Sequence, residues 1–172
     1  MTDINLTEPG SPAGSDRNGA KNNADLIELL FFAYRDFISD PDAILAEFGF
    51  GRAHHRVLHF VNRNPGLTVA DLLGILKITK QSLARVLKQL VDSGFIEQKP
   101  GPNDRRQRLL YTTEDGRMLA DRLIKPQSRR IDNALHGLGS AERAIVSRFL
   151  FEMIDRAEQA KVSRLTGKEQ KD

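Results

Sequence analysis

Apolar residues recur at helical spacing between positions 79 and 94 of this 172-residue chain. Four of them fall at i, i+3, i+4 and i+7 and would form one buried stripe: Leu83, Val86, Leu87 and Leu90. Thr79 is suited to cap the start of this helix, and Gly94 is suited to end it. The opposite face holds polar or small residues, with no acid before the last turn: Lys80, Gln81, Ala84, Arg85 and Lys88. The pattern predicts a short helix with one apolar face and one basic face.

A second short helix is predicted just before the first one. Thr68 and Asp71 have the spacing of a capping box. The apolar residues of this stretch would share a buried face: Val69, Leu72, Leu73 and Leu76. Few residues separate this helix from Thr79. Two short helices joined this tightly, the second of them basic, predict a helix-turn-helix.

The period of the pattern changes after Gly94. Residues 95–99 are predicted to form a strand, residues 100–104 a turn, and residues 107–112 a returning strand. A β-hairpin that directly follows a helix-turn-helix is a wing.

Helices at both ends of the chain have more apolar positions than one stripe needs. Apolar residues cover two sides of the predicted helix 24–39, and Asp40 with Pro41 predicts a separate short helix up to Phe48. Thr113 would cap a long helix that Pro126 should kink or split. Ser140 would cap a last helix with a continuous apolar seam. The helix 24–39 is expected to pack against a second subunit, and the last helix against other helices of the same subunit or of a partner.

The predicted fold class is mostly α: a winged helix-turn-helix with a small β-hairpin wing and long terminal dimerisation helices. Residues 1–21 are rich in Gly, Pro, Ser and Asn and are predicted to be a disordered tail, and residues 161–172 a charged tail. Between them, residues 22–160 would form a single domain. Its winged lobe would span about 52–112, and its dimerisation helices about 22–48 and 113–160.

Charge is distributed unevenly along the chain, although the net charge is only +3. Residues 77–108 hold eight bases and three acids, so the rest of the chain is mildly acidic. A basic segment of this kind is typical of a protein that binds nucleic acid. There is no cysteine, which excludes disulfides and Cys-ligated zinc. No apolar run has transmembrane length and no signal peptide is evident, so we expect a cytoplasmic protein without a membrane partner.

The order of elements resembles the MarR family of bacterial transcription regulators. The likeness covers roughly residues 22–158 and is sharpest over these motifs: Arg56-Val57-Leu58, Asn64-Pro65-Gly66, Thr68 to Leu72, Thr79 to Leu90, Gly94-Phe95-Ile96, Asp104-Arg105-Arg106 and Thr113 to Gly116. Thr112 departs from the family, which usually has Leu there. Residues 48–61 are similar to a PetP-like branch of the family.

The resemblance implies a homodimer that binds a pseudo-palindromic operator in double-stranded DNA. The recognition helices would lie in consecutive major grooves, and the wings would reach neighbouring minor grooves. The major-groove residues would be Thr79, Lys80, Gln81, Ser82, Arg85 and Lys88. The wing residues would be Asp104, Arg105, Arg106 and Arg108. Arg106 is the one expected to enter the minor groove, whereas Asp104 is expected to orient an arginine because phosphates repel a carboxylate.

The residue types on the basic helix suit different parts of a duplex. Arg85 can pair with a guanine edge and Gln81 with an adenine edge, whereas Lys80 and Lys88 suit phosphates. The simpler alternatives are a solvated basic face, and wing arginines that only pair with Asp104 or Glu97. A winged-helix module that binds RNA or protein is a further alternative, but the basic face has no aromatic residue on which RNA bases could stack.

Two histidines suggest a second kind of site. His55 and His59 are four residues apart on one helical face, so a metal-responsive regulator is an alternative. No third ligand is evident nearby, and a packed imidazole at position 55 is favoured. The family resemblance also implies a small-molecule effector, with Tyr34, Arg35, His55 and His59 as candidate ligand-binding residues. No enzyme motif is present, so neither catalysis nor a cofactor is expected.

Overall fold

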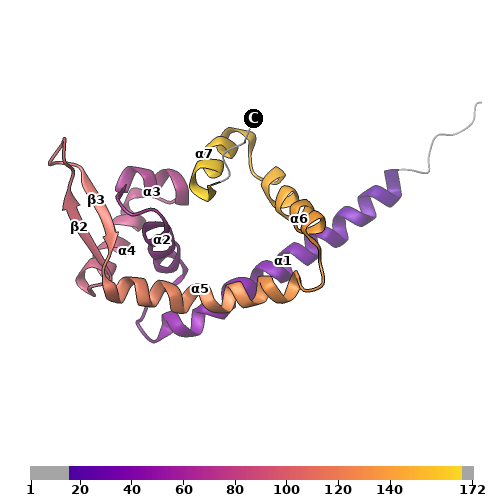
Figure 1. Cartoon of the computed structure of the whole chain (residues 1–172), viewed down its shortest axis with the longest axis horizontal. Helices are drawn as coiled ribbons and strands as arrows, with labels where there is room; N and C mark the ends of the chain where they lie inside the picture. The colour runs from indigo at the N-terminus through magenta and orange to yellow at the C-terminus, as the bar shows by residue number, and fades with distance from the viewer. Residues whose placement is uncertain (1–15, 168–172) are drawn as a thin grey trace, which may run out of the picture. The chain divides into compact units, whose positions relative to one another are not determined.

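The computed structural model describes residues 16–167, with side chains from residue 23 onward (Figure 1). The chain divides into two compact units inside helix α1 (Asp16–Ala46), and the boundary lies between Phe37 and Ile38. The first fifteen residues of the predicted N-terminal tail, and residues 168–172 of the predicted C-terminal tail, lie outside the described residues.

Helix α1 differs from its prediction at both ends. It begins at Asp16, before the predicted boundary near residue 22, because a helix that is already nucleated extends at little cost. It also continues through Pro41, so the separate short helix predicted there is wrong. The Pro41 side chain is fully buried, which offsets the missing backbone hydrogen bond. The Asp40 carboxylate binds Arg130 and does not cap a helix.

The predicted helix-turn-helix is confirmed. Helix α2 (Arg52–Arg63) is followed by strand β1 (Leu67–Thr68), helix α3 (Val69–Leu76) and helix α4 (Lys80–Asp92). Thr68 and Asp71 form the expected capping box at the start of α3. The apolar faces of these helices meet in one core, whose members on α2, α3 and α4 are Val57, Leu58, Val61, Leu72, Leu76, Leu83, Val86, Leu87 and Leu90. This core fixes the direction of the outer face of α4.

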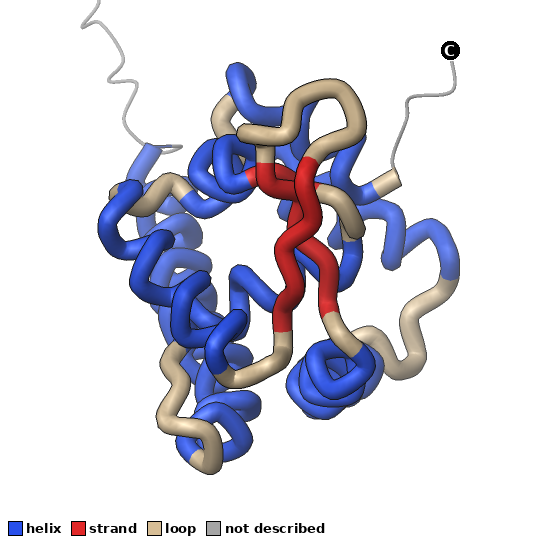
Figure 2. Tube along the Cα trace, turned by 90° about the vertical axis from the view of Figure 1, so that its left-hand side faces the viewer, coloured by secondary structure: helices blue, strands red, loops and turns tan. Residues whose placement is uncertain are grey.

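The predicted wing is confirmed as strands β2 (Ile96–Pro100) and β3 (Arg108–Thr112), which run side by side in red in Figure 2. They pair antiparallel, with Ile96 opposite Thr112. The short strand β1 adds to the other edge of β3, which gives the order β1-β3-β2. Sequence reasoning missed β1 because two residues are too few to show alternation. Buried Thr112 donates its hydroxyl to Asn62 Oδ1 at 3.1 Å, so the residue that departs from the family pattern has a partner.

Helix α5 (Glu114–Ala134) follows the wing and is capped by Thr113, as predicted. Pro126 lies inside α5 but does not split it. Leu119 and Leu123 are buried before the proline and Gln127 is buried after it. The helix is therefore packed against other parts of the protein on both sides of Pro126.

The predicted last helix is two helices. Helix α6 (Ser140–Glu152) is capped by Gly139 instead of Ser140, and helix α7 (Arg156–Thr166) follows a break at residues 153–155. The amide of Gln159 donates to the carbonyls of Phe151 and Ile154, so the carbonyl groups exposed at this break are satisfied. Helix α7 also includes residues 161–166, the first part of the predicted C-terminal tail.

Candidate nucleic-acid interface

Helix α4 has well-defined ends. The Thr79 hydroxyl accepts a hydrogen bond from the Ser82 amide at 3.1 Å and donates one to the Ser82 hydroxyl at 2.9 Å. Gly94 has a φ of +77°, and the amide of Phe95 donates to the carbonyl of Leu90 at 2.9 Å. Fixed ends and a buried stripe orient the remaining side chains toward solvent.

The sequence-predicted donors lie together on the outer side of α4. Thr79, Lys80, Gln81, Arg85 and Lys88 are exposed, and Ser82 is half-buried. Lys88 forms an ion pair with Asp92 at 2.5 Å, but both side chains are largely exposed. A pair this exposed contributes little stability, so the lysine can exchange it for another anion.

The turn between α3 and α4 is in contact with the C-terminal helix. Lys77 caps the end of α3 in the left-handed conformation, with a φ of 52°. Its ammonium group contacts Glu158 Oε1 of α7 at 2.8 Å, and this hydrogen bond lowers the pKa of Glu158. Sequence reasoning missed this pair because its members are 81 positions apart.

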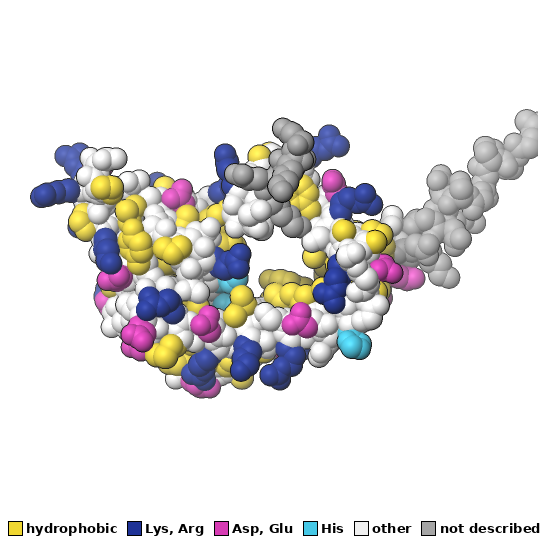
Figure 3. All heavy atoms as spheres, viewed as in Figure 1, with side chains coloured by type: hydrophobic (Ala, Val, Ile, Leu, Met, Phe, Trp, Pro, Cys, Tyr) yellow, Lys and Arg dark blue, Asp and Glu magenta, His cyan; other side chains and the backbone are white. Residues whose placement is uncertain are grey.

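The wing carries arginines at its tip. Arg105, Arg106 and Arg108 are exposed, and in the part of the chain that the structure describes none of them forms an ion pair. Glu97 pairs with Lys99 at 2.8 Å instead. Asp104 Oδ1 accepts a hydrogen bond from the backbone amide of Arg106 at 2.8 Å, so it orders the turn through the main chain. Basic side chains, dark blue in Figure 3, project from this end of the hairpin at the upper left.

The terminal helices expose apolar side chains. On α1, within the first unit, the exposed residues are Leu26, Ile27, Leu29, Leu30, Phe31, Phe32 and Tyr34. On α6, within the second unit, they are Ile145, Val146, Phe149 and Leu150, followed by Met153 at its end. Contiguous apolar surfaces of this kind are uncommon on monomeric proteins and mark interaction sites.

The sequence is similar to known proteins of one family. A family model described as MarR family matches residues 48–107. The transcriptional regulator PetP of Rhodobacter capsulatus is 47% identical over 131 residues, which are 76% of this chain and 79% of PetP. The chain belongs to the MarR family. As a member of this family it is a DNA-binding transcriptional regulator with a winged helix.

Solved structures agree with this assignment at the level of the fold. A MarR family regulator from Listeria monocytogenes, in complex with a 26mer DNA, has a TM-score of 0.65 and 22% identity; the match covers 85% of this chain and 97% of that one. A mutant MarR from E. coli in complex with operator DNA has a TM-score of 0.59 and 21% identity, with 76% and 94% covered. Among the described residues of this MarR-family protein, no helix is long and apolar enough to cross a membrane.

His54 is a third histidine of α2, and it is more deeply buried than His55 or His59. Its ring is buried and stacks on Phe50 with centroids 4.6 Å apart. The amide of Gly51 donates to Nδ1 at 3.1 Å, which leaves Nε2–H to donate to Gln89 Oε1 on α4 at 2.8 Å. No spacing rule could have found a bridge between residues 35 positions apart.

His55 and His59 are half-buried neighbours on α2, with ring centroids 6.5 Å apart. Among the described residues, no group of three or more His, Cys, Asp or Glu side chains could hold a metal ion. Burial lowers the pKa of both histidines. The positive charge of His59 lowers the pKa of His55 further, and the positive charge of Arg63 lowers the pKa of His59 further.

The lowered pKa values of His55 and His59 predict that the folded protein loses stability in weak acid. Their folded pKa values lie below the ordinary histidine value of 6.5, so the unfolded chain binds protons first as the pH falls through that value. The free energy of unfolding should therefore decrease between pH 7.5 and pH 5.5, as measured by urea denaturation. A His55→Gln/His59→Gln double variant should show a flatter profile over this range, and identical profiles would contradict the assignment.

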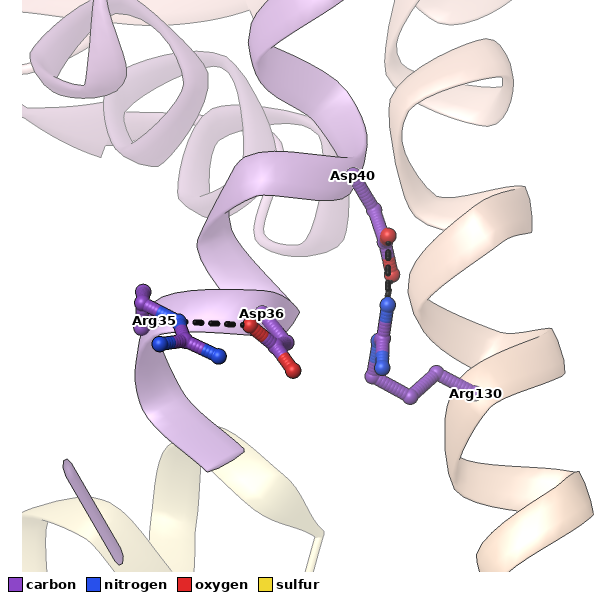
Figure 4. Close-up of polar contacts among 4 residues, drawn as sticks. All are labelled: Arg35, Asp36, Asp40 and Arg130. Atoms are coloured by element: carbon purple, nitrogen blue, oxygen red, sulfur yellow. Dashed lines mark hydrogen bonds and ion pairs between the residues drawn. The ribbon is translucent and has the colours of Figure 1, made fainter. Parts of the chain in front are cut away.

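The other two candidate ligand-binding residues, Tyr34 and Arg35, belong to the first unit and are exposed. Arg35 Nε donates to Asp36 Oδ1 at 2.8 Å, which raises the pKa of the guanidinium, and the group also lies 5.0 Å from the Phe32 ring centroid. Figure 4 shows this pair, and also Arg130 of α5 facing Asp40, to which it donates at 2.6 and 2.7 Å. These hydrogen bonds lower the pKa of Asp40.

Proposed function

We propose that this regulator acts as a homodimer that binds a pseudo-palindromic operator sequence-specifically. In each protomer, α4 lies in a major groove and the wing reaches the neighbouring minor groove. The observation that carries this proposal is the charge of the exposed side chains. The outer face of α4 has only donors and one alanine before Asp92, and the wing tip adds arginines without ion-pair partners among the described residues. Such a surface complements a polyanion.

The exposed residues of α4 fall into two groups, those suited to bind base edges and those suited to bind phosphates. Gln81 and Arg85 can each form a paired contact with a purine edge. Lys80 and Lys88 can bind phosphates, which position the protein without reading sequence. The hydroxyls of Thr79 and Ser82 are engaged in the cap of α4, where a phosphate near the helix N-terminus would still meet their exposed surfaces.

The wing contributes through Arg106, with Arg105 and Arg108 beside it. A narrow A·T-rich minor groove concentrates negative potential and attracts an arginine. Asp104 supports this role by holding the Arg106 amide, which fixes the backbone from which that side chain extends.

The exposed apolar residues of α1 and those of α6 support the proposed dimerisation, because a second copy of the chain would cover them. We also infer modulation by a small effector, as the family resemblance implied. His55 and His59 on α2 are its candidate contacts in the second unit, because both are half-buried and neither is needed for the His54 bridge.

The test begins with selection of an operator from a random DNA pool by the purified protein. Arg85→Ala should weaken operator binding by about ten- to a hundredfold and relax the preference at one base pair in each half-site, because alanine cannot pair with a base edge. Lys88→Ala should weaken operator and random DNA alike and reduce the salt slope by about 0.9 for each phosphate that the variant no longer neutralises. Binding is measured by fluorescence anisotropy over a range of salt concentrations.

Lys125→Ala is the matched control, because it removes the same charge from an exposed position on α5, outside α4 and the wing. It should leave both the affinity and the base preference nearly unchanged. Equal losses on operator and random DNA for Arg85→Ala would overturn the assignment of roles.

A further inference from the structure

Ala84 has a distinctive place on α4. Among the exposed residues of this helix, which the structure describes throughout, it is the only apolar one. On a helix surface the neighbours of a residue lie three and four positions away, and for Ala84 these include Lys80, Gln81 and Lys88. A surface that packs closely against α4 between these three donors would therefore also meet the Ala84 methyl group.

An apolar hollow lies beside Ala84. Its volume is about 340 Å³, and Leu87 and Val91 of α4 line it together with Val69 at the start of α3. Lys88, Asp92 and Gln98 are its polar lining residues, and the Asp92 carboxylate pairs there with Lys88. Ala84 thus lies at the boundary between the basic face of α4 and the apolar residues that line this hollow. A contact there favours an apolar group of a ligand that is otherwise polar and anionic.

The major groove of DNA offers one such group, the C5 methyl of thymine. We infer that Ala84 contacts a thymine methyl in each half-site and is a specificity-determining residue. The inference rests on the proposed function, because it requires α4 to lie in the major groove. Gln81, one turn earlier on the same face, suits adenine, and the thymine paired with an adenine presents its methyl in the same groove. The methyl that Ala84 contacts therefore belongs to an A·T pair that Gln81 reads, or to a pair next to it.

The test replaces single thymines of the selected operator by deoxyuridine, which removes only the methyl group. For the wild-type protein, the exchange at one position of a half-site should weaken binding by about three- to fivefold, the effect of burying one methyl group. With Ala84→Gly the same exchange should change the affinity by less than about 1.5-fold, because the partner methyl is absent. The glycine also weakens the helix, but that effect cancels in the ratio between the two DNAs.

Ala84→Ser is the second variant, because it keeps a small side chain and makes it polar. It should also lose most of the sensitivity to deoxyuridine. A wild-type protein that is insensitive at every position, while Arg85→Ala still relaxes base preference, would overturn this inference and leave the proposed function standing. Equal sensitivity of wild type and both variants would overturn it as well. Absence of any sequence preference in the wild type would overturn the proposed function, and this inference with it.

Discussion

Replacing Gly116 by alanine should destabilise the fold by about 1–3 kcal/mol, although alanine is normally the better helix former. Gly116 lies in the first turn of α5, and a Cβ atom there would overlap the carbonyl oxygen of Phe95 and press on Thr112. The same carbonyl accepts a hydrogen bond from the Thr113 amide at 3.1 Å. The neighbour is backbone and cannot move aside, so the start of α5 must shift. Urea denaturation followed by circular dichroism measures the change.

Gly74→Ala in α3 is the matched control. A Cβ atom at this position would meet only the end of the Lys161 side chain, with Nζ at 2.6 Å, and that flexible group can rotate away. The substitution should therefore be neutral or stabilise the protein by up to about 1 kcal/mol, as expected inside a helix. Similar losses for Gly74→Ala and Gly116→Ala would show that backbone crowding is not the cause.

Replacing Phe149 by lysine should dissociate the proposed dimer and weaken operator binding by at least about a hundredfold. Phe149 is 49% exposed in the single chain, between apolar neighbours on α6. An ammonium group placed in the interface would lose its hydration without a partner. The monomer also loses the gain in affinity that comes from binding two half-sites together, which is typically two to four orders of magnitude. Sedimentation velocity and anisotropy give the two measurements.

Glu152→Lys introduces a lysine at an exposed polar position of the same helix and serves as the control. This variant should stay dimeric and retain operator binding. The far-ultraviolet circular dichroism of both variants should match that of the wild type. A Phe149→Lys protein that remains dimeric at micromolar concentration would show that α6 does not form the interface.

The parts of the fold that the sequence predicted are those with local signals. The caps of α3 and α4, the apolar stripe of α4 and the turn of the wing each depend on residues within a few positions of one another. The outer-face positions of α4 follow from the same stripe, so the exposed donors could be identified from the sequence.

The errors occur where distant contacts override a local signal. Pro41 predicted a helix start, but its burial and the pairing of Asp40 with Arg130 keep α1 continuous. The seam of the last helix predicted one rod, but Gln159 stabilises a break. The packing of His54 has no local sequence signal, because its partner Gln89 lies on another helix.

The bridge between His54 and Gln89 has a mechanical consequence. A helix held only by an apolar stripe can roll slightly about its long axis, since such contacts have no preferred direction. A directional hydrogen bond from α2, on a different side of α4 from the stripe, opposes that rolling. The angular setting of the donor side chains is therefore coupled to α2, and a displacement of α2 would turn them with respect to the duplex.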